Sequence, residues 1–303
     1  MMTTTAIDRI WILSRHRVKY HRNIETSFSS FKRLARATFF FFALGSGAPE
    51  AEAAFERLAQ PPSCIGRGHT GCAGSGADFT QVNPAALAAC VRPHIALFHS
   101  PSPFEIPALS HSGISAALPF RFGTIQCTLT RSGMDLFREH TAMLTYAVAL
   151  DPAISIGASY VYNTLSIEGY GSAQTSGVDL GISASPASGL TLGASVLNVN
   201  RPVIGAASDE LPRVFILGMS YQLSSYACVS ADMVKDVRFP ESIHAGVEAA
   251  PLEFISIRAG TSTEPARIYG GLGIRAFAFE INYAIVTHQE LGLTHTIGIS
   301  FNP

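Results

Sequence analysis

The sequence predicts an all-β fold, a transmembrane antiparallel β-barrel of about 14 strands, and three observations lead to this prediction. Apolar residues alternate with small or polar residues along most of the chain. The composition is apolar, although the chain has no long apolar run. Finally, the connections between the alternating segments change regularly between tight and longer ones.

The alternation is clearest near the C-terminus. In residues 277–285 and 293–301 the odd positions are mostly apolar, and the even positions are mostly small or polar. Successive strand residues point to opposite faces of a sheet, so a period of two gives each strand one apolar and one polar face. The same pattern recurs in residues 154–160, 178–182, 190–196, 215–221, 229–233, 243–248 and 255–259. These segments predict strands, and none predicts a helix of useful length.

Charged residues within the predicted strands take the polar face. A soluble sandwich could turn its apolar face to a core, whereas a membrane barrel turns that face to lipid and the polar face to its lumen. Glu248 and Arg258 lie on neighbouring strands and could pair across the sheet. The candidate lumen-facing polar residues are Asp179, Asp232, His244, Glu248, Arg258, Arg275 and Glu280.

The composition favours the membrane alternative. Only 14% of the 303 residues are charged and 47% are hydrophobic, whereas about a quarter of the residues of a soluble protein are usually charged. The chain has no apolar run of roughly 18 residues, so transmembrane helices are not expected. Alternating strands explain an apolar composition that lacks an apolar run.

The connections predict how the barrel is oriented. Tight connections are expected at Asp151-Pro152, 185–188, 224–225, 250–251 and Ala276, and longer ones at 100–112, 132–139, 166–175 and 200–211. Outer-membrane barrels have short periplasmic turns and longer outer loops. We therefore expect a barrel over residues 93–303 in the bacterial outer membrane, with both termini in the periplasm. The expected strands begin near His94, Gly113, Gly123, His140, Ala153, Ser176, Gly189, Pro212, Tyr226, Glu241, Glu253, Arg267, Phe277 and Leu293.

Residues 1–53 have the order of a leader and secretory signal peptide. Basic residues at 32, 33 and 36 precede the apolar stretch 37–45, and Ala51-Glu52-Ala53 fits the small-x-small cleavage pattern. We expect cleavage after Ala53; a short buried or interfacial helix is the alternative. These residues hold 8 of the 21 Lys and Arg and 4 of the 22 Asp and Glu, so the remainder has a net charge of −5. That charge argues against a nucleic-acid partner.

Residues 54–92 are expected to form a plug-like segment. Irregularly spaced glycines predict a loose coil, and Asn83-Pro84 predicts a turn into a short helix. No phosphate-loop or dinucleotide motif is present, so no cofactor is expected. Cys64 and Cys72 could form a disulfide, although unpaired cysteines are at least as compatible with the odd count of five.

The histidines do not indicate a metal or catalytic site. None of them recur at i, i+4 on a helix or i, i+2 on a strand. His295 shares its face of the predicted strand with the apolar residues and lies near a rim of the barrel. As the base of a lipid hydrolase it would need a serine within hydrogen-bond reach. We expect no enzymatic activity and keep a lipid hydrolase as a distant alternative.

Short motifs make the chain similar to the PorV/PorQ branch of the FadL-like outer-membrane barrels. They are Asp78, 83–87, 211–213, 229–232, 235–236, 244–248, 257–260 and 291–301. The resemblance implies a fourteen-stranded barrel and an N-terminal segment in or under the lumen, with Asn83 and Pro84 as its motif. It also implies that Phe301 ends the signal read by the barrel-assembly machinery.

The resemblance implies two kinds of function. PorV-type members serve protein secretion of type IX, which predicts a secretion or outer-membrane biogenesis component with secreted cargo as partner. FadL relatives pass hydrophobic compounds, which predicts a passive transporter of hydrophobic small molecules as the alternative. Membrane lipid is a partner in both cases.

Overall fold

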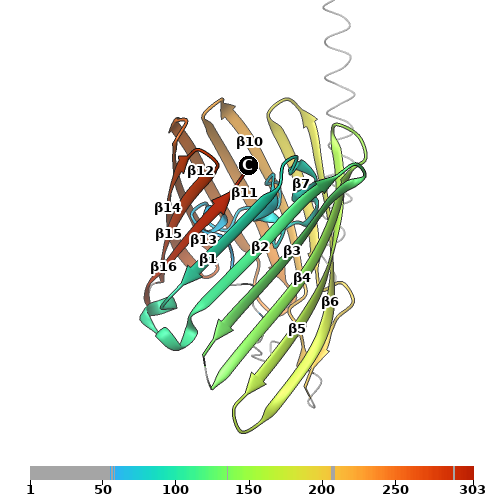
Figure 1. Ribbon diagram of the computed structural model, residues 1–303, viewed down its shortest axis with the longest axis vertical. Helices are drawn as coiled ribbons and strands as arrows, with labels where there is room; N and C mark the ends of the chain where they lie inside the picture. Colours follow the sequence, from blue (N-terminus) through green and yellow to red (C-terminus); the bar gives the residue numbers. More distant parts are fainter. Residues whose placement is uncertain (1–54, 56, 58, 135, 206–208, 289–290) are drawn as a thin grey trace, which may run out of the picture. The chain divides into compact units, whose positions relative to one another are not determined.

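The chain forms a closed barrel of fourteen antiparallel strands (Figure 1). The computed structural model describes residues 55, 57 and 59–303, apart from 135, 206–208 and 289–290. Strand β1 pairs with β2 on one side and with the last strand, β16, on the other, so the described barrel has no free edge. The predicted fold class and strand number are confirmed.

Each barrel strand pairs with its neighbours in the chain, in the order expected of an up-and-down barrel. A short hairpin lies in the link between β7 and β10, and its strands, β8 (Val203–Ile204) and β9 (Asp209–Glu210), have two residues each. The barrel strands are β1 (His94–Ser100), β2 (His111–Phe120), β3 (Gly123–Gly133), β4 (Phe137–Ala149), β5 (Ile154–Ile167), β6 (Gly171–Ala187), β7 (Leu190–Leu197), β10 (Val214–Ser224), β11 (Ala227–Asp236), β12 (Ser242–Leu252), β13 (Ile255–Thr263), β14 (Ala266–Ala276), β15 (Phe279–His288) and β16 (Gly292–Phe301).

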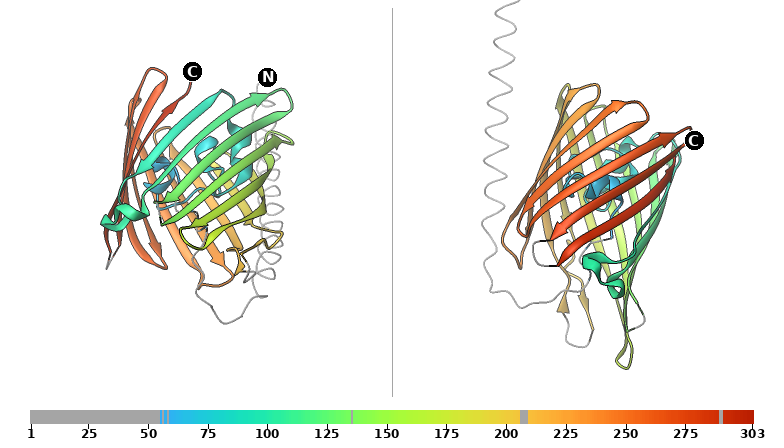
Figure 2. Two further views of the ribbon diagram at one scale, coloured as in Figure 1. Left: turned by 60° about the horizontal axis from the view of Figure 1, so that its bottom comes forward. Right: turned by 90° about the vertical axis from the view of Figure 1, so that its left-hand side faces the viewer.

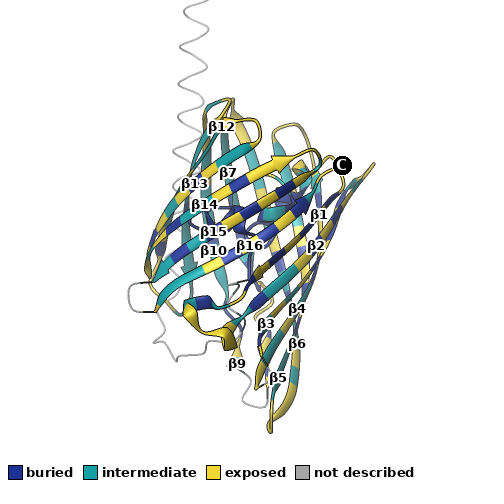
Figure 3. Ribbon diagram, turned by 60° about the vertical axis from the view of Figure 1, so that its left-hand side comes forward, coloured by how far each residue is buried: buried dark blue, intermediate teal, exposed yellow. Residues whose placement is uncertain are grey.

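The register explains the alternation in the sequence. Ile281 on β15 lies opposite Ile299 on β16, and Asn282 lies opposite Gly298. Ile281 is 51% exposed on the outer face, whereas Asn282 is only 4% exposed inside the barrel. Exposed and buried positions alternate in the same way along β14, β15 and β16 (Figure 3). The apolar parity therefore covers the outside of the barrel.

Two of the longer connections expected from the sequence are strands instead of loops. In the first link, expected over 132–139, β3 continues to Gly133 and β4 begins at Phe137. In the second, expected over 166–175, β5 continues to Ile167 and β6 begins at Gly171. The β5–β6 hairpin extends beyond the other strands at the end away from the C-terminus (Figure 1). Ser166 and Ser172, which both lie in the expected link, pair there within the ladder, and paired strands satisfy the backbone groups that a loop would leave to water.

Two segments expected as tight turns, 185–188 and 250–251, belong partly to strands in the structure. β6 continues to Ala187 with a register shift between Ala184 and Ala187. Likewise, β12 continues through Pro251 to Leu252, with a register shift after Ala249. Proline is tolerated at such irregular strand positions because it removes no regular ladder hydrogen bond there.

The remaining elements are short. They are α2 (Pro62–Ile65), η1 (Ala77–Phe79) and η2 (Pro84–Ala89) before the barrel, and η3 (Pro103–Glu105) and η4 (Pro107–Leu109) between β1 and β2. No helix among the described residues is long and apolar enough to cross a membrane. The signal peptide predicted in residues 1–53, with cleavage after Ala53, lies outside the described residues and stays a prediction.

Candidate functional site in the barrel lumen

Residues 59–90, together with Phe55 and Arg57, lie inside the barrel, and we call this segment the plug (Figure 2). Helix α2 packs against β14, β15 and β16, whereas η2 packs against β3, β4, β5 and β6. The plug therefore touches opposite parts of the wall. Its buried apolar side chains, such as Phe79, Val82 and Leu87, pack against wall residues.

Glycines on the inner face make room for the plug backbone. A Cβ atom added to Gly246 would lie 2.2 Å from the carbonyl oxygen of Arg67, and one added to Gly193 would lie 1.9 Å from that of Cys72. Both distances are shorter than the contacts that Cβ atoms make in proteins, so any side chain here would displace the plug. The small luminal residues seen in the sequence are therefore sites of close backbone approach.

Asn83 holds the plug at its turn. Its Oδ1 accepts a hydrogen bond from the backbone N–H of Ala85 and thereby caps η2, and Pro84 occupies the first position of that helix. Its Nδ2 donates to the carbonyl oxygens of Cys72, at 2.6 Å, and Ile182, at 3.1 Å. One buried side chain thus ties two plug segments to strand β6.

Two buried aspartates on the wall hold plug groups. Asp232 on β11 accepts hydrogen bonds from the backbone N–H groups of Gly71 and Cys72. Asp179 on β6 forms a 2.6 Å ion pair with Arg57 and also accepts a hydrogen bond from the N–H of Asn198. Both carboxylates are at most 1% exposed. A buried carboxylate is tolerated because charged partners and N–H donors replace its water.

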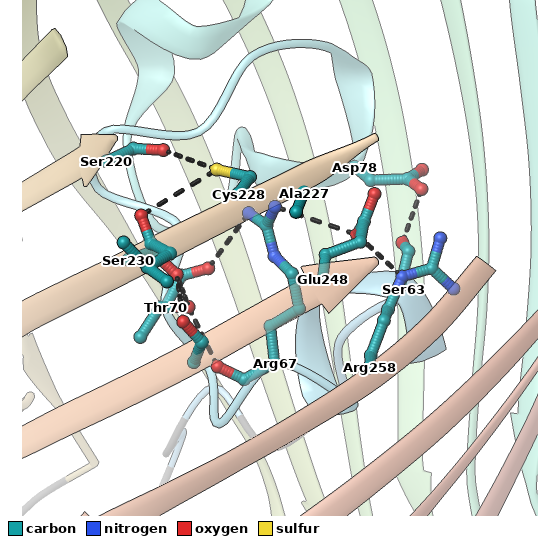
Figure 4. A network of polar contacts seen from close by, with 12 residues as sticks. Ser63, Arg67, Thr70, Asp78, Ser220, Ala227, Cys228, Ser230, Glu248 and Arg258 are labelled. Carbon is teal, nitrogen blue, oxygen red and sulfur yellow. Dashed lines mark hydrogen bonds and ion pairs between the residues drawn. The ribbon is translucent and has the colours of Figure 1, made fainter. Parts of the chain in front are cut away.

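An ionic network lines the mouth of the barrel on the side of the C-terminus, and Figure 4 shows its residues Arg67, Glu248 and Arg258. Arg258 donates to Glu248 at 2.8 Å and to Asn282 at 2.6 Å, and it also forms a 3.4 Å ion pair with Glu280. Arg67 of the plug reaches Glu248 at 3.7 Å. Charged pairs that share buried partners hold each other in place, and breaking one leaves an uncompensated charge.

The two remaining lumen-facing candidates are Arg275 and His244. Arg275 faces inward at the rim, with an exposed side chain, and pairs with Glu280 at 2.8 Å. His244 donates from Nδ1 to the carbonyl oxygen of Gly68 at 2.7 Å. The seven lumen-facing candidates therefore fall into two groups, anchors of the plug and members of the ionic network.

Asp78 connects the plug to the first strand. The hydroxyl of Ser63 donates to one of its carboxylate oxygens, and Nε2 of His94 contacts the other at 3.1 Å. Burial raises the pKa of Asp78, but the hydrogen bond and charge of His94 and the bond from Ser63 outweigh it, so the pKa lies below its usual 3.8. Since the carboxylate lies between the serine and the histidine, the histidine does not activate the hydroxyl, unlike in a hydrolase triad.

The plug also buries a histidine and two thiols. Nδ1 of His69 contacts Oε1 of Gln60 at 3.0 Å, and burial together with nearby His244 and Arg267 lowers the pKa of His69 to about 3. Cys64 and Cys72 are both buried and free, so the disulfide left open by the sequence is not formed. Burial raises the pKa of Cys64 to about 12, which leaves it unreactive. The described residues contain no cluster of three His, Cys, Asp or Glu side chains that could hold a metal ion.

His295, the hypothetical base of a lipid hydrolase, lies on the outer face. Its Nδ1 contacts the hydroxyl of Tyr283 at 2.6 Å, and the two rings stack. The hydroxyl of Ser100 donates to the backbone carbonyl oxygen of His295 at 2.7 Å, so this serine is not bound to the imidazole ring. The arrangement matches an aromatic and polar interface position better than a nucleophile and its base.

Two cavities adjoin the plug. A polar cavity of about 500 Å³ opens at the mouth, beside Arg67, Glu248 and Arg258. A small cavity of about 40 Å³ lies between Phe55, Arg57 and the wall of β3, β4 and β5. Beyond the small cavity, Phe55 packs with Ile204 and Leu211 of the β7–β10 link. The plug therefore borders a polar cavity at the mouth and an apolar cluster at the β7–β10 link.

Comparison with solved structures identifies the fold. The chain matches the CymD monoaromatic hydrocarbon channel with 13% identity and a TM-score of 0.65, covering 82% of this chain and 99% of that one. The Ralstonia pickettii toluene transporter TbuX matches with 13% identity and a TM-score of 0.61, over 82% and 100% of the two chains. A Pseudomonas aeruginosa FadL homologue matches with 12% identity and a TM-score of 0.55, over 82% and 98%. The chain has the fold of the FadL-like outer-membrane barrels.

No known family profile and no curated protein matches this chain. The PorV/PorQ branch suggested by the sequence motifs is accordingly not shown. Of the solved structures named above, TbuX is described as a toluene transporter and CymD as a monoaromatic hydrocarbon channel.

Several residues of the site were not recognised from the sequence. They include Arg57, Ser63, Arg67 and the pair formed by Thr70 and Ser230, whose hydroxyl oxygens lie 2.6 Å apart. The plug has no sequence periodicity, so nothing in its pattern indicates which of its side chains face the wall. The luminal glycines were the one available signal, because they show that something must fill the space.

Proposed function

We propose that the protein is a plugged channel that passes small hydrophobic compounds across the outer membrane. The observation that carries the proposal is the extent of the likeness to hydrocarbon channels. Residues 93–303 make up 211 of the 303 residues, about 70%, whereas the matches cover 82% of the chain. The likeness therefore extends beyond the barrel into the N-terminal segment, where the plug lies.

Passage requires the plug to move. The cavity next to Phe55, which packs with Ile204 and Leu211, has a volume of about 40 Å³. A small hydrophobic solute could replace the Phe55 side chain in this cluster without exposing apolar surface to water. The solute would then leave beside the plug toward the polar mouth.

Locking the plug tests this mechanism. The hydroxyl oxygens of Thr70 on the plug and Ser230 on β11 lie 2.6 Å apart, so cysteines at both positions should reach disulfide distance. The double variant Thr70→Cys, Ser230→Cys would be made in a background in which the five native cysteines are replaced by alanine. Uptake of labelled toluene by cells that express it should fall to the level of cells without the barrel, and a reducing agent should restore it.

Two controls separate the possible outcomes. The single variant Thr70→Cys should transport toluene regardless of the redox conditions. If cells with and without the unlocked barrel take up toluene at the same rate, the proposed transport is wrong. If the locked and reduced barrels transport equally, the plug does not need to move.

A second candidate is the PorV/PorQ-type role in secretion implied by the sequence motifs. The observation that favours it is the set of anchors, since a plug fixed by Asp179, Asp232 and Glu248 suits a barrel that presents a constant surface to a partner. This role predicts that C-terminal domains of secreted proteins co-purify with the barrel. Secretion that stays intact after deletion of the gene would count against it.

A further inference from the structure

The outer face of the barrel carries two neighbouring rows of different chemistry across β15, β16, β1, β2, β3 and β4. Both follow from the strand register, and these strands lie side by side in Figure 3. The first row is apolar and joins Ile281, Ile299, Leu97, Ile114 and Leu129. The second row lies two residues further along each strand and joins Ile297, His99, Ser112, Arg131 and His140. Two residues of strand separate the rows by about 7 Å.

The two rows border one hollow in the outer surface. This groove has a volume of about 750 Å³, and residues of both rows line it. Its apolar side is open to the surroundings, because Leu97, Ile114 and Leu129 are 43–49% exposed. A groove of this kind on the lipid-facing wall is filled by a hydrocarbon chain when the barrel is in a membrane.

The polar row is basic. Neither row contains an acidic residue. The Ser112 hydroxyl lies 2.8 Å from Nδ1 of His99, and when it donates there, Nε2–H of His99 remains free to donate outward. Arg131 is exposed, and within the described part of the chain no carboxylate pairs with it.

An arginine on the lipid-facing parity requires an anionic partner or a position near the interface. Among anions, phosphate matches the guanidinium group best, because two parallel N–H donors fit two phosphate oxygens. His140 lies beside Arg131 in the register, and His99 lies on its other side beyond Ser112. The row therefore offers several donors within reach of one phosphate group.

We propose that this groove binds one anionic membrane phospholipid. An acyl chain lies along the apolar row, and the phosphate is held by Arg131 with His99 and His140 beside it. Charge complementarity selects this occupant, because an uncharged chain would leave the basic row without partners. The site lies on the opposite face of the wall from the plug, so it does not depend on the proposed transport.

Native mass spectrometry of the detergent-solubilised barrel tests the proposal, with phosphatidylglycerol as probe and phosphatidylcholine of the same acyl chains as comparison. The wild-type barrel should retain one phosphatidylglycerol in preference to phosphatidylcholine, and inorganic phosphate should not displace it. Arg131→Gln should weaken the binding about tenfold, because a charge-assisted interaction is lost. Ile114→Trp should abolish it by filling the groove.

Matched controls lie elsewhere on the same barrel. Arg121 is exposed at the turn before β3, at the opposite end of that strand from Arg131, and Ile257 is a lipid-facing isoleucine on β13. Arg121→Gln and Ile257→Trp should bind phosphatidylglycerol like the wild type, and heat-modifiable gel mobility would show that all four variants are folded. Equal binding of the two lipids, unchanged binding in Arg131→Gln and Ile114→Trp, or equal losses in the control variants would overturn the proposal.

Discussion

The carboxylate of Asp232 accepts a 2.9 Å hydrogen bond from the backbone N–H of Cys72, which lies 160 residues earlier in the chain. The same oxygen accepts a 2.8 Å bond from the N–H of Gly71. The plug contains only short helices, so most of its backbone groups lack partners within a helix. A wall side chain that satisfies two of them gives the plug one preferred position in the lumen.

Replacing Asp232 by alanine is expected to release the plug locally. Two buried N–H groups would lose their acceptor, at a cost of roughly 2–6 kcal/mol, since each unsatisfied group costs about 1–3 kcal/mol. Hydrogen exchange of residues 66–74 should accelerate, whereas the barrel strands should keep their protection. Glu253→Ala, at an exposed position on the β12–β13 turn, is the matched control. Unchanged exchange of the plug in Asp232→Ala would contradict its role as an anchor.

Introducing a side chain at Gly246 should displace the plug by steric exclusion. The Cβ of a valine there would meet the carbonyl oxygen of Arg67 at 2.2 Å and the hydroxyl of Thr70 at 2.8 Å. Limited proteolysis should then cut within residues 59–90 at a protease concentration that leaves the wild type intact. Gly270→Ala serves as control, because its added Cβ has only one contact, at 3.3 Å. Equal resistance of both variants would show that the plug tolerates the change.

Acid should loosen the plug through His69. In the folded protein the pKa of His69 is lowered to about 3 by burial first and by nearby His244 and Arg267 second, whereas in a released plug it is near its ordinary 6.5. The released state therefore binds a proton between pH 6.5 and 3, and the plug loses up to about 2 kcal/mol of stability at pH 5. The lowered pKa of Asp78 acts in the same direction, but only below its usual 3.8.

Hydrogen exchange of the plug at pH 7 and pH 5, corrected for the intrinsic rate, measures this effect. His69→Gln keeps a side-chain amide that can donate to Gln60 but cannot titrate in this range. The variant should lose the part of the pH dependence that His69 causes. An identical pH dependence in the wild type and the variant would rule out His69 as its source.

The barrel could be predicted from the sequence because its pattern is local. Strand parity alone placed Glu248 and Arg258 on the same face of neighbouring strands, and they form a 2.8 Å ion pair in register. By contrast, the contact between Asp232 and Cys72 joins a strand to a segment without periodicity, so no local pattern indicates it. The long β5–β6 hairpin was missed because polar residues beyond the membrane form strands as readily as loops.

A charge on the outer face should be far more costly than one at the polar mouth. Ile281→Lys should destabilise the barrel by about 2–4 kcal/mol if that residue lies near the bilayer midplane. Ser220→Lys is the suitable comparison, because Ser220 lines the 500 Å³ cavity at the mouth. Asn282→Lys would be a poor comparison, since Asn282 accepts a hydrogen bond from Arg258 and a lysine would place two cations together. Equal unfolding free energies in lipid vesicles for Ile281→Lys and Ser220→Lys would contradict the assigned faces.

Spin labels on neighbouring strands measure most directly which face of the barrel meets lipid. Labels at Ile281 and Ile299 point outward, and labels at Asn282 and Ser300 point toward the plug. In reconstituted bilayers, the relaxation of the outward pair should be enhanced strongly by oxygen, which dissolves in lipid, and that of the inward pair only weakly. Strong oxygen enhancement at Asn282 and Ser300, with little at Ile281 and Ile299, would contradict a barrel whose apolar face meets lipid and whose polar face surrounds a plug.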